Sequence, residues 1–199
     1  MKVFLHSFIK NLKIATSLLL KKKRKFNVGS GGINNDNSWY ASDISVLDIT
    51  KDTDWRKLLL FMKVDNIMAE HVWEHLNDSD TILANRNCYH FLKRKGTLRL
   101  AVPDGYNPNK KYIDHVRPGG DGAGADDHKI LYNYKIMKQR LEEVGFKVNL
   151  LEYWDEFGNF HFTDWSDEGG RVERSRRYDP RNKNGELEYT SLIVDAVKI

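Results

Sequence analysis

The sequence predicts an α/β fold with a mainly parallel sheet, helices on both faces and one antiparallel strand near the edge. Three observations support this prediction. A short apolar run at 26–28 enters a turn that has glycines at 29, 31 and 32. Downstream, extended apolar segments alternate with helical ones, which is typical of a parallel sheet covered by helices. The chain closes on two predicted strands around a polar stretch, and such a hairpin would place one antiparallel strand at or near the edge.

The individual elements follow from local patterns. Strands are expected at 26–28, 39–44, 64–69, 97–102, 146–154 and 189–197, and 46–49 is expected to be a brief strand or an extended segment. Helices are expected at 55–61, 78–92 and 129–144. The Asn-rich segment 33–38 predicts a loop where a doubly wound fold normally has a helix. Two polar, glycine-bearing stretches at about 104–128 and 155–188 predict insertions into a domain that spans 26–199, the first of them as a long loop.

Composition narrows the function classes. With 199 residues, the chain has the length of one domain with a core of useful size. Much of its net charge of +4 comes from the basic block 21–25, so the spread basic surface of a nucleic-acid-binding protein is not expected. The single cysteine, Cys88, excludes an internal disulfide and fits a reducing, cytoplasmic location. No apolar run reaches the ~18 residues of a membrane span.

Residues 1–25 are expected to form a helical lead-in that ends in the basic block. The block is either a solvated face, which is the commoner role and the one we favour, or a peripheral contact with an anionic membrane.

The glycine turn at 29–32 is typical of a cofactor site. Glycine adopts positive φ and allows close approach to the backbone, and α/β folds bind adenosine cofactors at the carboxyl end of the first strand. Asp43 and Asp48 follow, and a carboxylate can accept two hydrogen bonds from ribose hydroxyls. The third glycine directly follows the second rather than lying three positions on, which argues against a dinucleotide.

Further segments carry a family resemblance. They are 27–32, 47–50, 69–76 (Ala-Glu-His-Val-Trp-Glu-His-Leu, the most specific), 100–106, 127–129, 151–155 and 189–193. In this order they resemble the class I S-adenosylmethionine-dependent methyltransferases with their Rossmann-like sheet, and more specifically the small predicted type 11 family associated with glycan biosynthesis. The resemblance covers nearly all of the chain from residue 26 onward. The turn 93–96 departs from it, because the family has a proline and two glycines there.

The resemblance implies a binding site for S-adenosylmethionine. Gly29, Ser30 and Gly31 would form the turn against its methionine part. Asp43 matches the ribose-binding acid. Asp48 and Ile49 match the segment that lines the adenine, and Glu70 and His71 the residues beside the sulfonium. No metal site is predicted, although a divalent metal is chemically compatible with the reaction.

The reaction needs positioning and, for a hydroxyl acceptor, a base. His128 is the leading base candidate, followed by Asp104 and His71. Asp104 follows a strand at its carboxyl end but also belongs to a Pro-Asp-Gly turn. The run Asp126-Asp127-His128 suits a base, a divalent metal site or an N-cap of the helix expected from 129, and we expect one of the aspartates to be the cap. His71 and His75 lie four residues apart, a spacing that can bind a metal, but their order is not that of a zinc protease, so a structural role for His75 is favoured.

Aromatic residues alternate with acids in the insertion at 155–188 and at the end of the strand before it. These aromatic residues either bind a carbohydrate together with the acids, or pack the insertion onto the sheet. Its arginines either bind phosphates or form solvated ion pairs, and we favour ion pairs. We therefore expect an O-methyltransferase that acts on a sugar or glycan, with glycosyltransferases as conceivable partners. The alternatives are methylation of another small molecule or a lipid, and a non-catalytic nucleotide-binding module that partners a glycosyltransferase.

Overall fold

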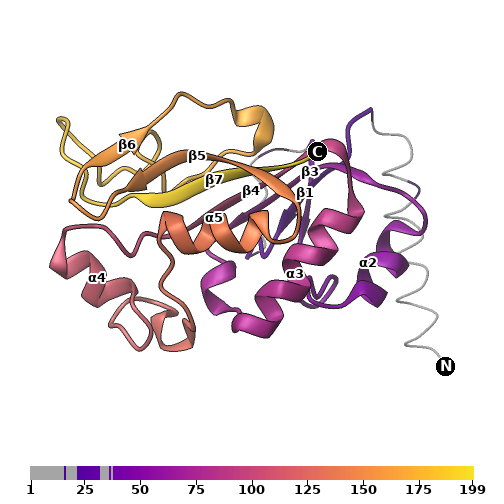
Figure 1. The fold of residues 1–199 in the computed structure, drawn as a ribbon, viewed down its shortest axis with the longest axis horizontal. Coiled ribbons are helices and arrows are strands. Elements are labelled where there is room, and N and C mark those ends of the chain that lie inside the picture. The colour runs from indigo at the N-terminus through magenta and orange to yellow at the C-terminus, as the bar shows by residue number, and fades with distance from the viewer. Residues whose placement is uncertain (1–15, 17–21, 32–35, 37) are drawn as a thin grey trace.

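The computed structural model describes residues 16, 22–31, 36 and 38–199, so most of the expected helical lead-in lies outside the described residues. In the described part of the chain, seven strands form one sheet in the order β2-β1-β3-β4-β7-β5-β6 (Figure 1). They are β1 (Lys25–Val28), β2 (Trp39–Ser42), β3 (Val64–Glu70), β4 (Leu92–Pro103), β5 (Phe146–Trp154), β6 (Phe160–Phe162) and β7 (Ser191–Lys198). Strands β1 to β4 are mutually parallel, as the sequence predicts.

The reversed strands differ from the prediction of a single antiparallel strand near the edge. β7 runs antiparallel to both β4 and β5 and lies inside the sheet rather than at its edge. A second reversed strand, β6, forms the edge and comes from the 155–188 insertion. The expected strand at 46–49 is absent from this region, because Asp48 accepts hydrogen bonds from both the amide and the hydroxyl of Thr50 and so makes a turn.

Three α-helices pack on one face of the sheet: α2 (Asp52–Leu59), α3 (Asp78–Phe91) and α5 (Tyr134–Glu142) (Figure 1). They bury apolar side chains such as Trp55 and Met137 in the main core. α3 begins one residue after Asn77, whose side chain caps the amide of Asp80. α5 begins at Tyr134 rather than at 129, because Asn133 is its cap and accepts two amide hydrogen bonds.

The other face differs from the prediction of helices on both sides. In the part of the chain that the structure describes, the 155–188 insertion crosses this face with only a short 3₁₀ turn, η3 (Asp167–Gly169). Trp165 and Val172 of the insertion form a second core with Ala101, Leu151 and Ile193 of the sheet. A long polar segment therefore covers this face of the sheet in place of helices, and two of its apolar side chains, Trp165 and Val172, anchor it.

Arg99 of β4 fixes the insertion to the sheet. Its buried guanidinium pairs with Asp195 of β7 at 2.7 Å and donates to the carbonyls of Ser166 and Gly170 at 2.8 and 2.7 Å. The same guanidinium lies 4.8 Å from the ring centre of Trp165. Polar and apolar contacts therefore hold the same part of the insertion.

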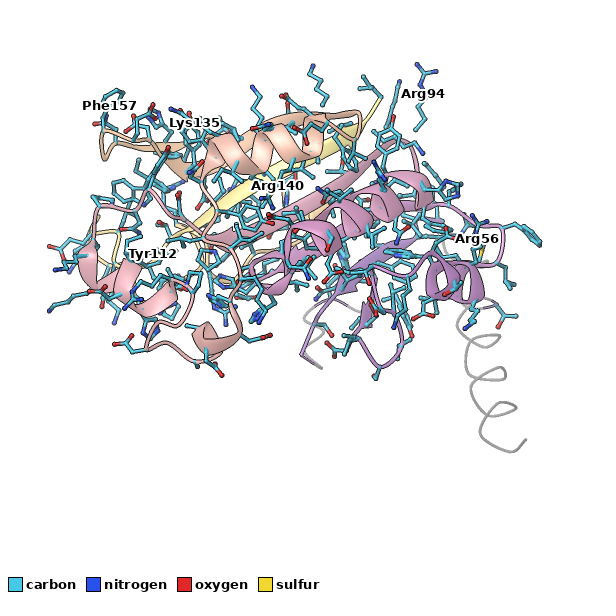
Figure 2. The ribbon with its side chains drawn as sticks, turned by 60° about the horizontal axis from the view of Figure 1, so that its bottom comes forward. Arg56, Arg94, Tyr112, Lys135, Arg140 and Phe157 are labelled. Atoms are coloured by element: carbon cyan, nitrogen blue, oxygen red, sulfur yellow. The ribbon has the colours of Figure 1, made fainter. Side chains whose placement is uncertain are left out.

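The segment 104–128 is not only the long loop that the sequence predicts. It contains α4 (Lys110–Val116), capped by Asn109, and a 3₁₀ turn, η2 (Ala125–Asp127). The hydroxyl of Tyr112 on α4 accepts from the amide of Asp104 and donates to the carbonyl of Thr190, which joins this segment to the sheet. Figure 2 shows Tyr112 on α4 and Phe157, 83% exposed, at the outer tip of the β5–β6 connection. Among the described residues, no helix has the length and apolar character to cross a membrane.

Candidate functional site

A cavity of about 920 Å³ lies at the carboxyl ends of β1 and β3, with the insertion as its opposite wall. The sheet side contributes Asn27, Gly29, Ser30, Gly31, Asp36, Trp39, Met68, Glu70 and His71. The insertion contributes Asp167, Arg171, Glu173, Arg174, Tyr178, Asp179, Pro180 and Arg181. Five predicted cofactor residues, those at 29–31, 70 and 71, therefore meet at one cavity although they come from two strands.

The turn after β1 has the backbone that its glycines allow. Gly29 has φ 66°, and a Cβ there would overlap Cγ2 of Val72, so the turn packs tightly against the segment after β3. Gly31 has φ 59°, and a Cβ there would meet no atom within 4 Å. The amide of Gly31 donates to Asp43 Oδ1 at 3.2 Å, which holds the predicted ribose-binding carboxylate beside the turn. Asp43 itself is outside the cavity lining.

Glu70 connects β3 to the insertion. Its carboxylate accepts from the amides of Glu173 and Arg174 at 3.0 and 2.7 Å and lies 3.6 Å from the Arg174 guanidinium. Glu70 therefore holds the wall of the cavity in place, a role that the sequence did not predict.

His71 follows at the rim, with φ 55°, a left-handed conformation that is uncommon for a residue other than glycine. Its Nδ1 lies 3.0 Å from Glu74 Oε1, and its Nε2 lies 3.2 Å from the Ser191 hydroxyl. Positive φ at such a residue costs on the order of 1–3 kcal/mol and is found at functional sites. The ring lines the large cavity and also a second one.

Two predicted adenine-lining residues lie away from the cavity. Asp48 makes the turn with Thr50 and an ion pair with Lys51, and these hydrogen bonds, working against its partial burial, hold the pKa of its carboxyl below the usual value. Ile49 packs in the main core, and its carbonyl accepts from the ring of Trp55. The structure brings neither of them to the β1 and β3 ends.

Asp104 is fully buried and lines neither cavity. Its two oxygens accept from the amides of Tyr106 and Trp154 at 3.0 and 2.7 Å, so it ties the end of β4 to the end of β5. Burial raises its pKa to about 6, although these two hydrogen bonds oppose the shift. A pKa near neutral pH is suited to a general base, but Asp104 is buried away from both cavities and has a structural role.

The second cavity, of about 380 Å³, adjoins the first and shares His71, Arg174 and Arg181 with it. It brings together His71, His75, His115 and His128. His128, the leading base candidate, is therefore near His71 but outside the large cavity. His75, expected to be structural, lines the same space, and its ring packs edge-on against that of His128 with centres 4.8 Å apart.

Four arginines of the insertion form ion pairs, as favoured from the sequence, and the fifth, Arg176, lies over the ring of Phe162. Arg171 pairs with Glu173, Arg177 with Asp167 and Arg181 with Asp179, and Arg174 pairs with Glu70. The aromatic residues of the insertion differ in burial. Trp165 packs the insertion onto the sheet and donates its ring N–H to Glu152. Phe157 and Phe162 are exposed.

Sequence reasoning missed several cavity residues. Trp39 and Met68 read as ordinary strand residues, and Asp167, Tyr178 and Asp179 lie in a segment without periodicity. The only signal for the latter group was the length of the insertion, since long loops in compact domains are often functional.

The comparisons agree with this architecture. No family model and no curated protein matches the sequence. Among solved structures, an S-adenosylmethionine-dependent methyltransferase from Archaeoglobus fulgidus matches with a TM-score of 0.51 and 17% identity, over 96% of this chain and 94% of that one. The chain has the fold of these enzymes. A Thermotoga maritima protein, described as an S-adenosylmethionine-dependent methyltransferase and possible histamine N-methyltransferase, matches with a TM-score of 0.51 and 10% identity, over 96% of this chain and 89% of that one. At these identities the likeness concerns the fold alone.

Proposed function

We propose that the protein is an S-adenosylmethionine-dependent O-methyltransferase that methylates a hydroxyl group of a sugar or glycan. The observation that carries this proposal is the meeting of the glycine turn after β1 with Glu70 and His71 after β3 at one cavity. Open α/β sheets bind their ligands at the carboxyl ends of the strands. The Archaeoglobus fulgidus and Thermotoga maritima proteins, which share the fold, are described as S-adenosylmethionine-dependent methyltransferases, which supports the same cofactor here.

The residues at the cavity fit this cofactor. The volume of about 920 Å³ is in the range of small-molecule sites, roughly 300–1,000 Å³. The Gly31 backbone has open space where a side chain would be, so a ligand can approach it closely. The turn 29–31 would hold the methionine end, and Asp43 beside it the ribose. The bound cofactor supplies an activated methyl group, and the protein supplies the alignment of the acceptor oxygen.

We assign the general base to His71 rather than to His128 or Asp104. His71 lines both cavities, so its ring borders the large cavity in which we propose that the cofactor and the sugar acceptor bind. Glu74 lies beside Nδ1, and a proton held there leaves Nε2 with the lone pair that accepts a proton. The hydroxyl of Ser191, 3.2 Å from Nε2, can donate to that nitrogen until an acceptor hydroxyl takes its place.

The sugar acceptor is supported by the chemistry of the insertion. Its side of the cavity combines Tyr178 with Asp167 and Asp179, and aromatic faces with carboxylates are suited to bind sugar C–H surfaces and hydroxyls. Glycosyltransferases that prepare such an acceptor would be functional partners under this proposal.

Calorimetry with S-adenosylhomocysteine tests the cofactor site. We expect binding by the wild type, at least tenfold weaker binding by Asp43→Ala, and nearly unchanged binding by Asp48→Ala, which removes an acid that is bonded to Thr50 and not to the glycine turn. Absence of binding to the wild-type protein would overturn the assignment.

Formation of S-adenosylhomocysteine from S-adenosylmethionine, measured with panels of sugars, glycans, lipids and small hydroxy compounds, tests the reaction. His71→Asn is the informative variant, because Asn tolerates left-handed φ and cannot serve as a base. It should keep cofactor binding and lose turnover at least 100-fold. Turnover only with lipids or small molecules would refute the glycan acceptor, and binding without any turnover would favour a non-catalytic module.

A membrane contact through the basic block is a separate proposal. Lys23 pairs with Glu168 at 3.4 Å, and the Lys25 ammonium lies 5.2 Å from the ring centre of Trp39, so part of the block is engaged with the protein itself. Co-sedimentation with anionic vesicles, with and without residues 1–25, tests whether the block also contacts lipid. Equal sedimentation of the two forms would refute the contact.

A further inference from the structure

Three side chains of metal-binding types cluster beside the second cavity: His75 and His128 line it, and Glu74 is buried next to them. Of the three, the proposed methyl transfer uses only Glu74, through its contact with His71. One ligand atom each from Glu74, His75 and His128 lies within 4.8 Å of the other two. Glu74 and His75 belong to a 3₁₀ turn, η1 (Trp73–His75), directly after β3. His128 comes from the far side of the 104–128 insertion and is held there because the Glu74 carbonyl accepts from the amides of Lys129 and Ile130. The fold therefore brings His128 to the Glu-His pair through backbone contacts.

Glu74 lacks the partners that a buried carboxylate requires. Its side chain is 1% exposed, and neither oxygen accepts a hydrogen bond. His71 Nδ1 lies 3.0 Å from Oε1, at ion-pair distance but without the geometry of a hydrogen bond. Among the described residues, no Lys or Arg forms an ion pair with Glu74. Burial of an ionised carboxylate is costly unless it is paired or bound to a metal, so this group calls for a cation.

The two histidines are oriented as metal ligands are. His128 Nδ1 lies 2.7 Å from the carbonyl oxygen of Val116, and because a carbonyl only accepts, this nitrogen carries the proton. His75 Nδ1 lies 3.3 Å from the carboxylate of Asp127, which likewise only accepts when ionised. Each neutral ring then has its free lone pair on Nε2. Ligating histidines almost always donate their other nitrogen to a carbonyl or carboxylate in this way.

We propose that Glu74, His75 and His128 bind a divalent transition-metal ion of the Zn²⁺ class. Two imidazoles and one carboxylate form a three-ligand set that zinc enzymes use, in which the fourth position is left for water or substrate. Ligand atoms about 2.1 Å from Zn²⁺ in a tetrahedral site are roughly 3.4 Å apart, so the three side chains close in by about an ångström on binding. The contact of His71 with Oε1 would position Glu74, and the second cavity, which His75 and His128 line, would give water or substrate access to the ion.

The site does not rest on the proposed methyl transfer, so it is tested by metal binding. The protein is purified without a histidine tag, stripped with a chelator and titrated with Co²⁺, whose visible absorption reports coordination number, and with Zn²⁺ in competition. Bound metal per chain is measured by mass spectrometry after dialysis against Zn²⁺. We expect about one ion per chain and a tetrahedral or five-coordinate Co²⁺ spectrum.

His115 provides the matched control, because it lines the same cavity but pairs with Asp121 and is 49% exposed. His115→Ala should bind Zn²⁺ as the wild type does, whereas His75→Ala, His128→Ala and Glu74→Gln should each bind at least 100-fold more weakly. Circular dichroism identifies any variant that fails to fold, and S-adenosylhomocysteine binding on the same samples separates loss of the cofactor site from loss of the metal. A wild-type protein that binds no Zn²⁺ at micromolar concentration, or equal losses in His115→Ala and His128→Ala, would overturn the proposal.

Discussion

Replacement of Arg99 by methionine should release the insertion from the sheet. Methionine keeps much of the apolar stem that packs beside Trp165 but removes the guanidinium. Asp195 then loses its partner, and the carbonyls of Ser166 and Gly170 lose their donor. The Arg99 side chain is 3% exposed and that of Asp195 18%, so water replaces these contacts incompletely.

Removal of one partner of a buried ion pair costs about 3–5 kcal/mol, and the partial exposure of Asp195 places the expected loss near the lower end, about 3 kcal/mol. For a chain of this length, that corresponds to a melting temperature lower by roughly 6–12 °C. Urea denaturation measures the free energy of unfolding. Limited trypsin digestion reports the insertion directly, because its arginines become cleavable when it leaves the sheet.

Arg171→Met is the matched control. It removes an arginine of the same insertion whose ion pair with Glu173 is exposed, and exposed pairs contribute about 0–1 kcal/mol. The double variant Arg99→Met with Asp195→Leu should recover part of the lost stability, because it no longer leaves a half-buried carboxylate unpaired. The reasoning is refuted if Arg99→Met unfolds within about 0.5 kcal/mol of the wild type and resists trypsin equally.

Three further predictions follow from individual side chains. Burial raises the pKa of Asp104 to about 6 in the folded protein from an ordinary 3.8, so the folded state binds the proton more tightly than the unfolded state. The free energy of unfolding should therefore fall by roughly 3 kcal/mol as pH rises from about 4 to 6. Urea denaturation should show this pH dependence in the wild type and not in Asp104→Asn, and parallel curves for the two proteins would contradict it. Burial raises the pKa of the Cys88 thiol, which is fully enclosed, so it should react with a thiol reagent only at the rate of unfolding; rapid modification of the native protein would show that it is accessible. Gly29→Ala should destabilise the fold by more than Gly31→Ala, because its methyl group meets Val72 whereas that at Gly31 meets open space and adds only the strain of left-handed φ, about 1–2 kcal/mol; equal melting temperatures would refute this.

The parallel half of the fold was predictable because its signals are local. The apolar runs of β1 and β3 and the glycine turn between β1 and β2 lie close together in the sequence, and parallel strands bring their carboxyl ends to one edge. The glycine turn is recognisable from its own residues, and the family resemblance implies that Glu70 and His71 lie beside the same cofactor; in the structure all three line one cavity. Asp48 and Ile49 were expected there too, but the chain turns at Asp48 instead of extending as a strand.

The second face was not predictable, because its signals are sparse and its contacts distant. Trp165 and Val172 are two apolar residues in a polar segment, too few to make a pattern, yet they anchor the insertion. Arg99 reads as a solvent-facing strand residue, and only tertiary structure shows that it is buried against Asp195, 96 residues away. His128 is likewise far from Glu74 in sequence, and the backbone contacts that join them carry no residue-type signature.

The position of β7 in the sheet affects how the protein folds during translation. β7 follows every other strand in the chain, yet it lies between β4 and β5. During synthesis, strands β1 to β4 and the β5–β6 hairpin are completed before β7. They cannot form one sheet until then, because β7 is the strand that lies between β4 and β5. Until residues 191–198 emerge from the ribosome, the inner edges of β4 and β5 expose unpaired backbone groups that can pair with another chain. A protein of this topology is therefore expected to depend on chaperones until β7 has been synthesised, and deletion of residues 191–198 should cause aggregation rather than leave a shortened domain.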